Sequence, residues 1–173
     1  RLSGDPTDLY LPVDATDEMR TQFRELYGLD DPLLKVYMRA TVLASEYLIY
    51  IPAIVIFLRR LARLQGVNTW EYSIALVAVL MQPATMLIDH GHFQYNTVML
   101  GFVVASMSSM LAGRLLWSCV FFVAALGFKQ MALFYAPAVF AYLLGSCIHP
   151  RLDALRFISI ALTTALCFAA LFA

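Results

Sequence analysis

The side chains best suited to chemistry in this sequence lie in one polar turn, which we define as residues 89–96. The turn follows an apolar run and reads DHGHFQYN, so that hydrogen-bonding groups alternate with aromatic rings. An ordinary connection between two helices favours Gly, Pro, Ser and Asn instead. Ionisable and amide side chains beside an apolar run are costly unless they face a partner or a wet cavity. The turn holds five candidate substrate-binding residues: Asp89, His90, His92, Gln94 and Tyr95.

The residue types of the polar turn leave three interpretations open. Aromatic rings beside hydrogen-bonding groups suit a carbohydrate, whose ring faces stack and whose hydroxyls need donors and acceptors. A hydrogen-bonded corner that only fixes the angle between two helices would use similar groups. A metal ion held by His90 and His92 would need a further ligand, and no Cys or Glu is suitably spaced for that. We expect a polar substrate cavity that binds neither a metal nor a cofactor.

Three more polar residues lie near the ends of apolar runs. Lys129 and Gln130 interrupt the apolar sequence between positions 115 and 146. A lone Lys at such a boundary either extends its ammonium to the membrane surface or neutralises an anionic group such as a lipid phosphate. Arg39 shares a helix face with Glu46, and the two either hold helices together or line a cavity. We include Lys129, Gln130 and Arg39 among the candidate substrate-binding residues.

The elements that position these residues must be membrane helices. Apolar residues make up 61% of the chain and charged residues 14%, against about 45–50% and about 25% in soluble domains. A zero formal net charge gives no indication of nucleic-acid binding. A membrane crossing takes about 20 apolar residues. We predict an all-α polytopic membrane protein with six spans: residues 36–58, 72–88, 97–112, 115–128, 131–146 and 157–173. Alternatively, the short fourth and fifth runs form one broken region.

The arginines predict which loops face the cytosol. Six arginines follow the first, third and fifth runs, whereas the loops after the second and fourth runs hold only Lys129 as a basic residue. Cytoplasmic loops carry the Lys/Arg excess, so the loops after the odd-numbered spans are expected to be cytosolic. The polar turn and Lys129 then lie on the luminal side. The six arginines are Arg59, Arg60, Arg63, Arg114, Arg151 and Arg156.

The same orientation makes residues 1–35 a luminal segment. Asp14 is a suitable N-cap for a short helix within it, and Gly28 a suitable end. The apolar side chains of this helix fall on one face. We expect the helix either to lie flat on the membrane interface or to pack on its own protein.

Three stretches together resemble a known family. They are LKVYMRATVLASE at residues 34–46, LIDHGHFQYN at residues 87–96 and FKQMALFYAP at residues 128–137. In order and spacing they resemble the dolichyl-phosphate-glucose-dependent alpha-1,3-glucosyltransferases of N-glycan precursor assembly. The likeness extends over residues 28–147. The Gly between the two His, and the Lys-Gln-Met run, resemble the members that add the first glucose more than those that add the second.

The resemblance implies a GT-C type transmembrane helix bundle in the endoplasmic-reticulum membrane, with its active face in the lumen. It implies inverting transfer of glucose from dolichyl phosphate glucose to the dolichyl-diphosphate-linked high-mannose oligosaccharide Man9GlcNAc2. The catalytic Asp of such enzymes stands in a GDYEAQRHW-like motif of the first luminal loop, which has no counterpart here. We therefore assign no catalytic residue and expect this chain alone to be inactive. A polytopic transporter, or a non-catalytic membrane subunit, is the alternative function.

The charge distribution yields a topological prediction. Single cysteines at Gln65 and at Gly91, in a background without the three native cysteines, should react with an impermeant thiol reagent from opposite sides of sealed microsomes. Arginine-rich loops stay cytosolic, so Gln65 should react without permeabilisation and Gly91 only after it. Labelling of both cysteines from the same side would contradict the predicted orientation.

Overall fold

A computed structural model describes residues 15–26, 32–86, 89, 95–148 and 153–172, and all structural statements concern these residues. Within them the regular structure is entirely helical. The elements in chain order are α1 (Asp17–Leu26), α2 (Pro32–Ser45), a π-helical turn η2 (Glu46–Tyr50), α3 (Ile51–Gln65), α4 (Thr69–Leu80), α5 (Pro83–Met86), α6 (Asn96–Leu111), α7 (Leu115–Phe128), a 3-10 helix η4 (Gln130–Tyr135), α8 (Ala136–Ile148) and α9 (Ala154–Phe172).

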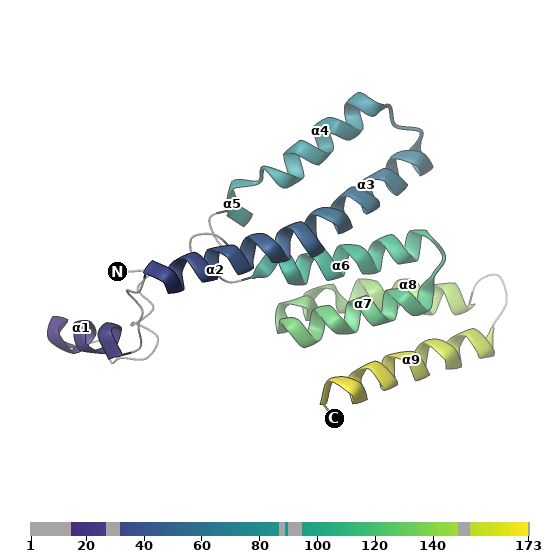
Figure 1. The fold of residues 1–173 in the computed structure, drawn as a ribbon. Helices are drawn as coiled ribbons and strands as arrows, with labels where there is room; N and C mark the ends of the chain where they lie inside the picture. The colour runs from purple at the N-terminus through teal and green to yellow at the C-terminus, as the bar shows by residue number, and fades with distance from the viewer. Residues whose placement is uncertain (1–14, 27–31, 87–88, 90–94, 149–152, 173) are drawn as a thin grey trace.

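The helices pack side by side as a bundle (Figure 1). Helices α2 and α3 form one long rod through η2, and α4 returns along α3. On the other side of the rod lies α6, which packs against α3 and α7. Helix α9 closes the bundle against α7 and α8. This order places α6 at the centre of the fold.

Helix α6 is buried on several faces because many of its side chains are small. Its buried residues are Thr97, Val98, Met99, Gly101, Val103, Ser106, Ser108, Ser109 and Met110. Small residues let helix backbones approach closely in a membrane, and hydroxyl groups link neighbouring helices. The Ser106 hydroxyl lies 2.9 Å from that of Ser118 on α7, and both side chains are fully buried. This hydrogen bond joins α6 to α7 in the core.

The long first rod contains a π turn because Pro52 lacks a backbone N–H. Without that donor the carbonyl of Leu48 has no α-helical partner at Pro52. The chain widens over η2, and the N–H of Ile51 bonds to the carbonyl of Glu46, five residues back. Such single π turns are local bulges in otherwise regular helices. Here the bulge packs directly against α6.

Helices occupy the predicted runs, but their bounds differ. The first helical stretch continues to Gln65, beyond the predicted end at residue 58. The run expected over residues 72–88 is not one continuous helix, since α4 ends at Leu80 and α5 begins at Pro83. The reason is that a residue preceding proline is disfavoured in the α conformation, which ends α4 before Gln82. The fourth and fifth runs are two helices and not one broken region. Phe122 packs with Val139, and Cys119 with Cys147, so α8 runs back along α7.

Three helical stretches among the described residues have the length and composition of membrane spans: Val36–Gln65, Gln130–Ile148 and Ala154–Leu171. The apolar helices Thr69–Leu80, Asn96–Leu111 and Leu115–Phe128 are shorter. The crossing of the membrane by these shorter helices stays a prediction.

A helix also lies in the N-terminal segment, where α1 begins at Asp17. The Thr16 hydroxyl accepts a hydrogen bond from the N–H of Met19 over 3.4 Å, so Thr16 acts as the N-cap. Asp14 and Gly28, which we expected to bound this helix, lie outside the described residues. The placement of α1 on a membrane interface stays a prediction.

The close contact between α6 and the π turn predicts that a methyl group added at Gly101 destabilises the protein. A Cβ added at Gly101 would lie 2.9 Å from Ile49 Cγ2 and 3.1 Å from Tyr50 Cα. We expect Gly101→Ala to lower the free energy of unfolding by about 1–3 kcal/mol, as overpacking does. The measurement is thermal unfolding of the full-length protein in detergent. Gly145→Ala is the matched control, because a Cβ at Gly145 in α8 meets nothing within 4 Å. Equal effects of the two substitutions would contradict the close approach.

Candidate functional site

Asp89, the first residue of the polar turn, binds the start of α6. Its carboxylate is fully buried and accepts two backbone hydrogen bonds, from the N–H of Asn96 over 2.9 Å and from the N–H of Thr97 over 2.5 Å. The first amides of a helix have no partner within the helix and carry a partial positive charge. Asp89 therefore caps α6 from seven residues upstream and brings the two ends of the polar turn together.

Tyr95 fixes the other end of the polar turn. Its backbone is left-handed, with φ 54° and ψ 32°, a conformation that is strained for a residue with a side chain. The Tyr95 hydroxyl lies 2.8 Å from the Thr41 hydroxyl, which itself donates to the carbonyl of Met38 in α2. This contact ties the polar turn to the first rod and holds the strained residue in place.

Lys129 lies at the same end of the bundle, between α7 and η4. Its backbone is extended, with φ −152° and ψ 129°, so the chain turns at this residue. The ammonium group donates to the side-chain carbonyl of Asn96, the first residue of α6. Asn96 thus links Lys129 to the polar turn that Asp89 caps. The structure brings Lys129, Asp89 and Tyr95 together around the start of α6. Their role as substrate-binding residues on a luminal face stays a prediction.

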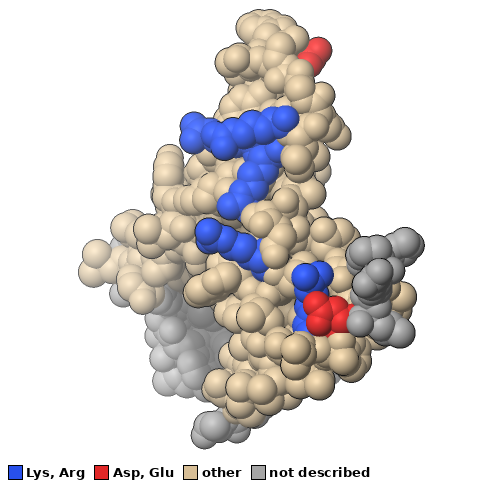
Figure 2. All heavy atoms as spheres, turned by 90° about the vertical axis from the view of Figure 1, so that its right-hand side faces the viewer, with Lys and Arg blue, Asp and Glu red and all other residues tan. Residues whose placement is uncertain are grey.

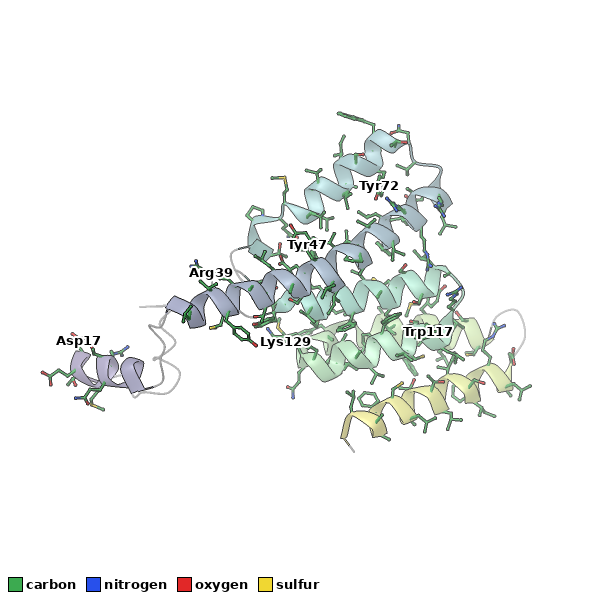
Figure 3. All side chains as sticks on the ribbon, in the orientation of Figure 1. Asp17, Arg39, Tyr47, Tyr72, Trp117 and Lys129 are labelled. Atoms are coloured by element: carbon green, nitrogen blue, oxygen red, sulfur yellow. The ribbon has the colours of Figure 1, made fainter. Side chains whose placement is uncertain are left out.

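The other predicted residues are placed differently. Arg39 lies on α2 at the same end of the bundle as Lys129 (Figure 3), and its side chain is exposed. Among the described residues it forms no hydrogen bond or ion pair. Gln130 begins η4 and is exposed. His90, His92 and Gln94 lie outside the described residues, so both the substrate-cavity and metal interpretations remain predictions for them.

Two residues of the site were missed at the sequence level. Thr41 holds Tyr95 from 54 positions away, and no local pattern marks it. Thr97 is buried, and its hydroxyl has no hydrogen-bond partner among the described residues. The position of Thr97 in the first turn of α6 was a signal that could have marked it, since buried polar groups need partners.

The arrangement separates two electrostatic tasks. Asp89 uses both carboxylate oxygens on amides of α6, so its charge stabilises the helix end. Lys129 supplies a positive charge beside the turn, at the boundary between apolar helices. A cation in that position can neutralise an anionic ligand such as a phosphate.

The chain matches a known protein family. The model of the ALG6, ALG8 glycosyltransferase family matches residues 13–173, which include all of the described residues. The chain belongs to this family. The family is named for glycosyltransferases and not for transporters.

Individual relatives match most of this chain. The dolichyl pyrophosphate Man9GlcNAc2 alpha-1,3-glucosyltransferase of Saccharomyces cerevisiae is 46% identical over 141 residues, which is 81% of this chain and 26% of the relative. A protein named as the probable equivalent in Schizosaccharomyces pombe is 43% identical over 141 residues, 82% of this chain and 28% of the relative. A protein named as the probable equivalent in Arabidopsis thaliana is 36% identical over 144 residues, which is 82% of this chain and 27% of the relative. The chain thus spans about a quarter of the length of these relatives.

The cap on α6 predicts that Asp89→Asn destabilises the protein. An Asn amide offers one oxygen where the carboxylate offers two, and its NH2 would face a backbone N–H. We expect a loss of about 1–3 kcal/mol in the free energy of unfolding, measured by thermal unfolding of the full-length protein in detergent. Asp153→Asn is the matched control, because Asp153 accepts from the N–H of Arg156 at the start of α9 but is partly exposed. Comparable losses in the free energy of unfolding at both positions would show that the burial of Asp89 adds nothing to the stability that its cap provides.

Proposed function

We propose that this chain is part of a glucosyltransferase of the endoplasmic-reticulum membrane. The enzyme would transfer glucose from dolichyl phosphate glucose to the dolichyl-diphosphate-linked oligosaccharide Man9GlcNAc2, with inversion at the sugar carbon. The observation that carries the proposal is the family match over residues 13–173. The activity for which relatives up to 46% identical are named supports the choice of acceptor. The resemblance of the polar turn and of residues 128–137 to enzymes that use dolichyl phosphate glucose supports the donor.

The reaction sets the requirements for the site. An acceptor hydroxyl attacks the anomeric carbon of glucose, the bond from that carbon to the phosphate oxygen breaks, and dolichyl phosphate leaves. The hydroxyl proton passes to a general base, which we do not assign to any residue of this chain. Asp89 is a poor base in the described conformation, because both of its oxygens accept from α6 amides.

We assign the substrate contacts to the end of the bundle where α6 begins. Lys129 would stabilise the negative charge on the departing phosphate, since fixed positive groups at such positions are major contributors to catalysis. His90, His92, Gln94 and Tyr95 would offer hydrogen bonds and a stacking face to the sugars. Gln130 and Arg39, both exposed at this end, would contact the lipid-linked substrates. Asp89 would act by positioning the polar turn.

Three substitutions test the proposal in glucosyl-transfer assays of the full-length enzyme. Lys129→Met should raise the KM for dolichyl phosphate glucose or lower kcat by roughly tenfold to a hundredfold, as expected for a lost charged hydrogen bond. His92→Ala and Gln94→Ala should lower transfer by a similar factor with unchanged expression. Activity should persist after exhaustive chelation, because the proposed site uses no metal.

Two controls separate the charge of Lys129 from its contact with Asn96. Lys129→Arg keeps the charge and should retain most activity. Asn96→Ala removes the contact with Lys129 but leaves the ammonium group, so it should impair transfer less than Lys129→Met. Wild-type kinetics in Lys129→Met would refute the phosphate role. Loss of activity on chelation, restored by zinc or manganese, would favour the metal interpretation.

A further inference from the structure

A cavity lies toward the opposite end of α6 from the polar turn. Helix α6 runs from Asn96 to Leu111, so at 1.5 Å per residue its two ends are roughly 22 Å apart. We name this second site the basic cavity. It has a volume of 260 Å³ between α3, α6 and α7, and its lining residues are Ala53, Ile56, Arg60, Ala105, Ser108, Ser109, Arg114, Trp117 and Phe121.

The polar part of the basic cavity offers donors for an anion. Arg60 from α3 donates through Nη1 to the carbonyl of Ser108 over 2.5 Å, which fixes its guanidinium at the cavity wall. Arg114 precedes α7 and is exposed. Neither arginine forms a salt bridge with a carboxylate among the described residues. Figure 2 looks onto this end and shows that Lys and Arg side chains gather on it, with few acidic ones.

Ser108 supplies an independent observation that points to a ligand. Its side chain is 4% exposed, lines the basic cavity, and its hydroxyl has no hydrogen-bond partner in the described part of the chain. An unpartnered buried hydroxyl costs about 1–3 kcal/mol. A ligand oxygen in the cavity would accept its hydrogen and remove that cost.

The basic cavity has arginines at one end and apolar side chains along the rest of its wall. Ile56 lies one helical turn before Arg60, and Ala53 about two turns before it, toward the middle of the rod. On the α7 side the rings of Trp117 and Phe121 follow one another with centroids 6.0 Å apart. Trp117 is the third residue of α7, and Trp near the end of a membrane helix is typical of the region where lipid headgroups meet acyl chains. A ligand with a phosphate at the arginines and an apolar chain along this wall would match both parts of the cavity.

We infer that the basic cavity binds an anionic glycerophospholipid, with its phosphate between Arg60 and Arg114, an oxygen at Ser108, and an acyl chain along Ile56 and Phe121. Basic pockets between membrane helices recognise such headgroups. Inorganic phosphate offers the same charge but would leave the apolar wall uncovered. The site is separate from the proposed sugar-transfer site and does not depend on that function.

The test is native mass spectrometry of the full-length protein in detergent, titrated with dioleoyl phosphatidylinositol and dioleoyl phosphatidylcholine. We expect about thirtyfold tighter binding of the anionic lipid, since two arginines at roughly 1 kcal/mol each contribute about 2 kcal/mol. The double variant Arg60→Gln, Arg114→Gln should bring the two lipids to within twofold of each other. Ser108→Ala should weaken phosphatidylinositol binding several-fold without lowering thermal stability.

The matched control is the double variant Arg59→Gln, Arg63→Gln, which removes two exposed charges from the same end of α3 but none from the cavity lining. It should keep most of the preference for phosphatidylinositol, and Arg60→Lys should keep more of it than Arg60→Gln. Equal losses in the two double variants would refute a specific site, as would equal wild-type affinity for both lipids. Competition by millimolar inorganic phosphate, or tighter binding of dolichyl phosphate, would overturn the glycerophospholipid assignment.

Discussion

The close approach of α6 to the first rod is the constraint on which the rest of the structure depends. Gly101 brings the α6 backbone against η2, where even one added carbon would lie 2.9 Å from Ile49 Cγ2. With α6 seated there, Asp89 caps its first amides and Arg60 bonds to the carbonyl of Ser108. The polar turn at one end and the basic cavity at the other are therefore both positioned by the same helix.

Much of the architecture follows from the sequence because membrane helices are specified by composition. A helix in lipid must satisfy its own backbone, so long apolar runs leave little choice of secondary structure. This is why the runs at residues 97–112 and 115–128 agree with α6 and α7 to within a residue. The breaks were less well predicted, although Pro52 and Pro83 were visible signals of a bulge and of a helix end. Their effect depends on how neighbouring helices accommodate the freed carbonyl groups.

The sequence shows which residues of the candidate site are polar, but it does not show which groups they bond to. The polar turn stood out because its side chains are expensive beside an apolar run. That Asp89 would bind α6 amides could not be inferred, because the choice between a ligand and a helix end is made by tertiary packing. The Thr41 contact with Tyr95 joins residues 54 positions apart, and no periodicity encodes it. The sequence pointed to the polar turn, and the structure shows the positioning contacts of Asp89 and Tyr95 there.

The buried bond between Ser106 and Ser118 bears on how the chain enters the bilayer. Helices α6 and α7 have 16 and 14 residues, and each carries hydroxyl groups that hydrocarbon would leave unsatisfied. Between them the chain reverses at Gly113, whose φ of 71° suits a tight turn. Neither helix is therefore well suited to partition into lipid by itself. The two form a hairpin in which the Ser106 and Ser118 hydroxyls satisfy each other, so its insertion as one unit during biosynthesis would avoid the cost that each of these hydroxyls meets alone.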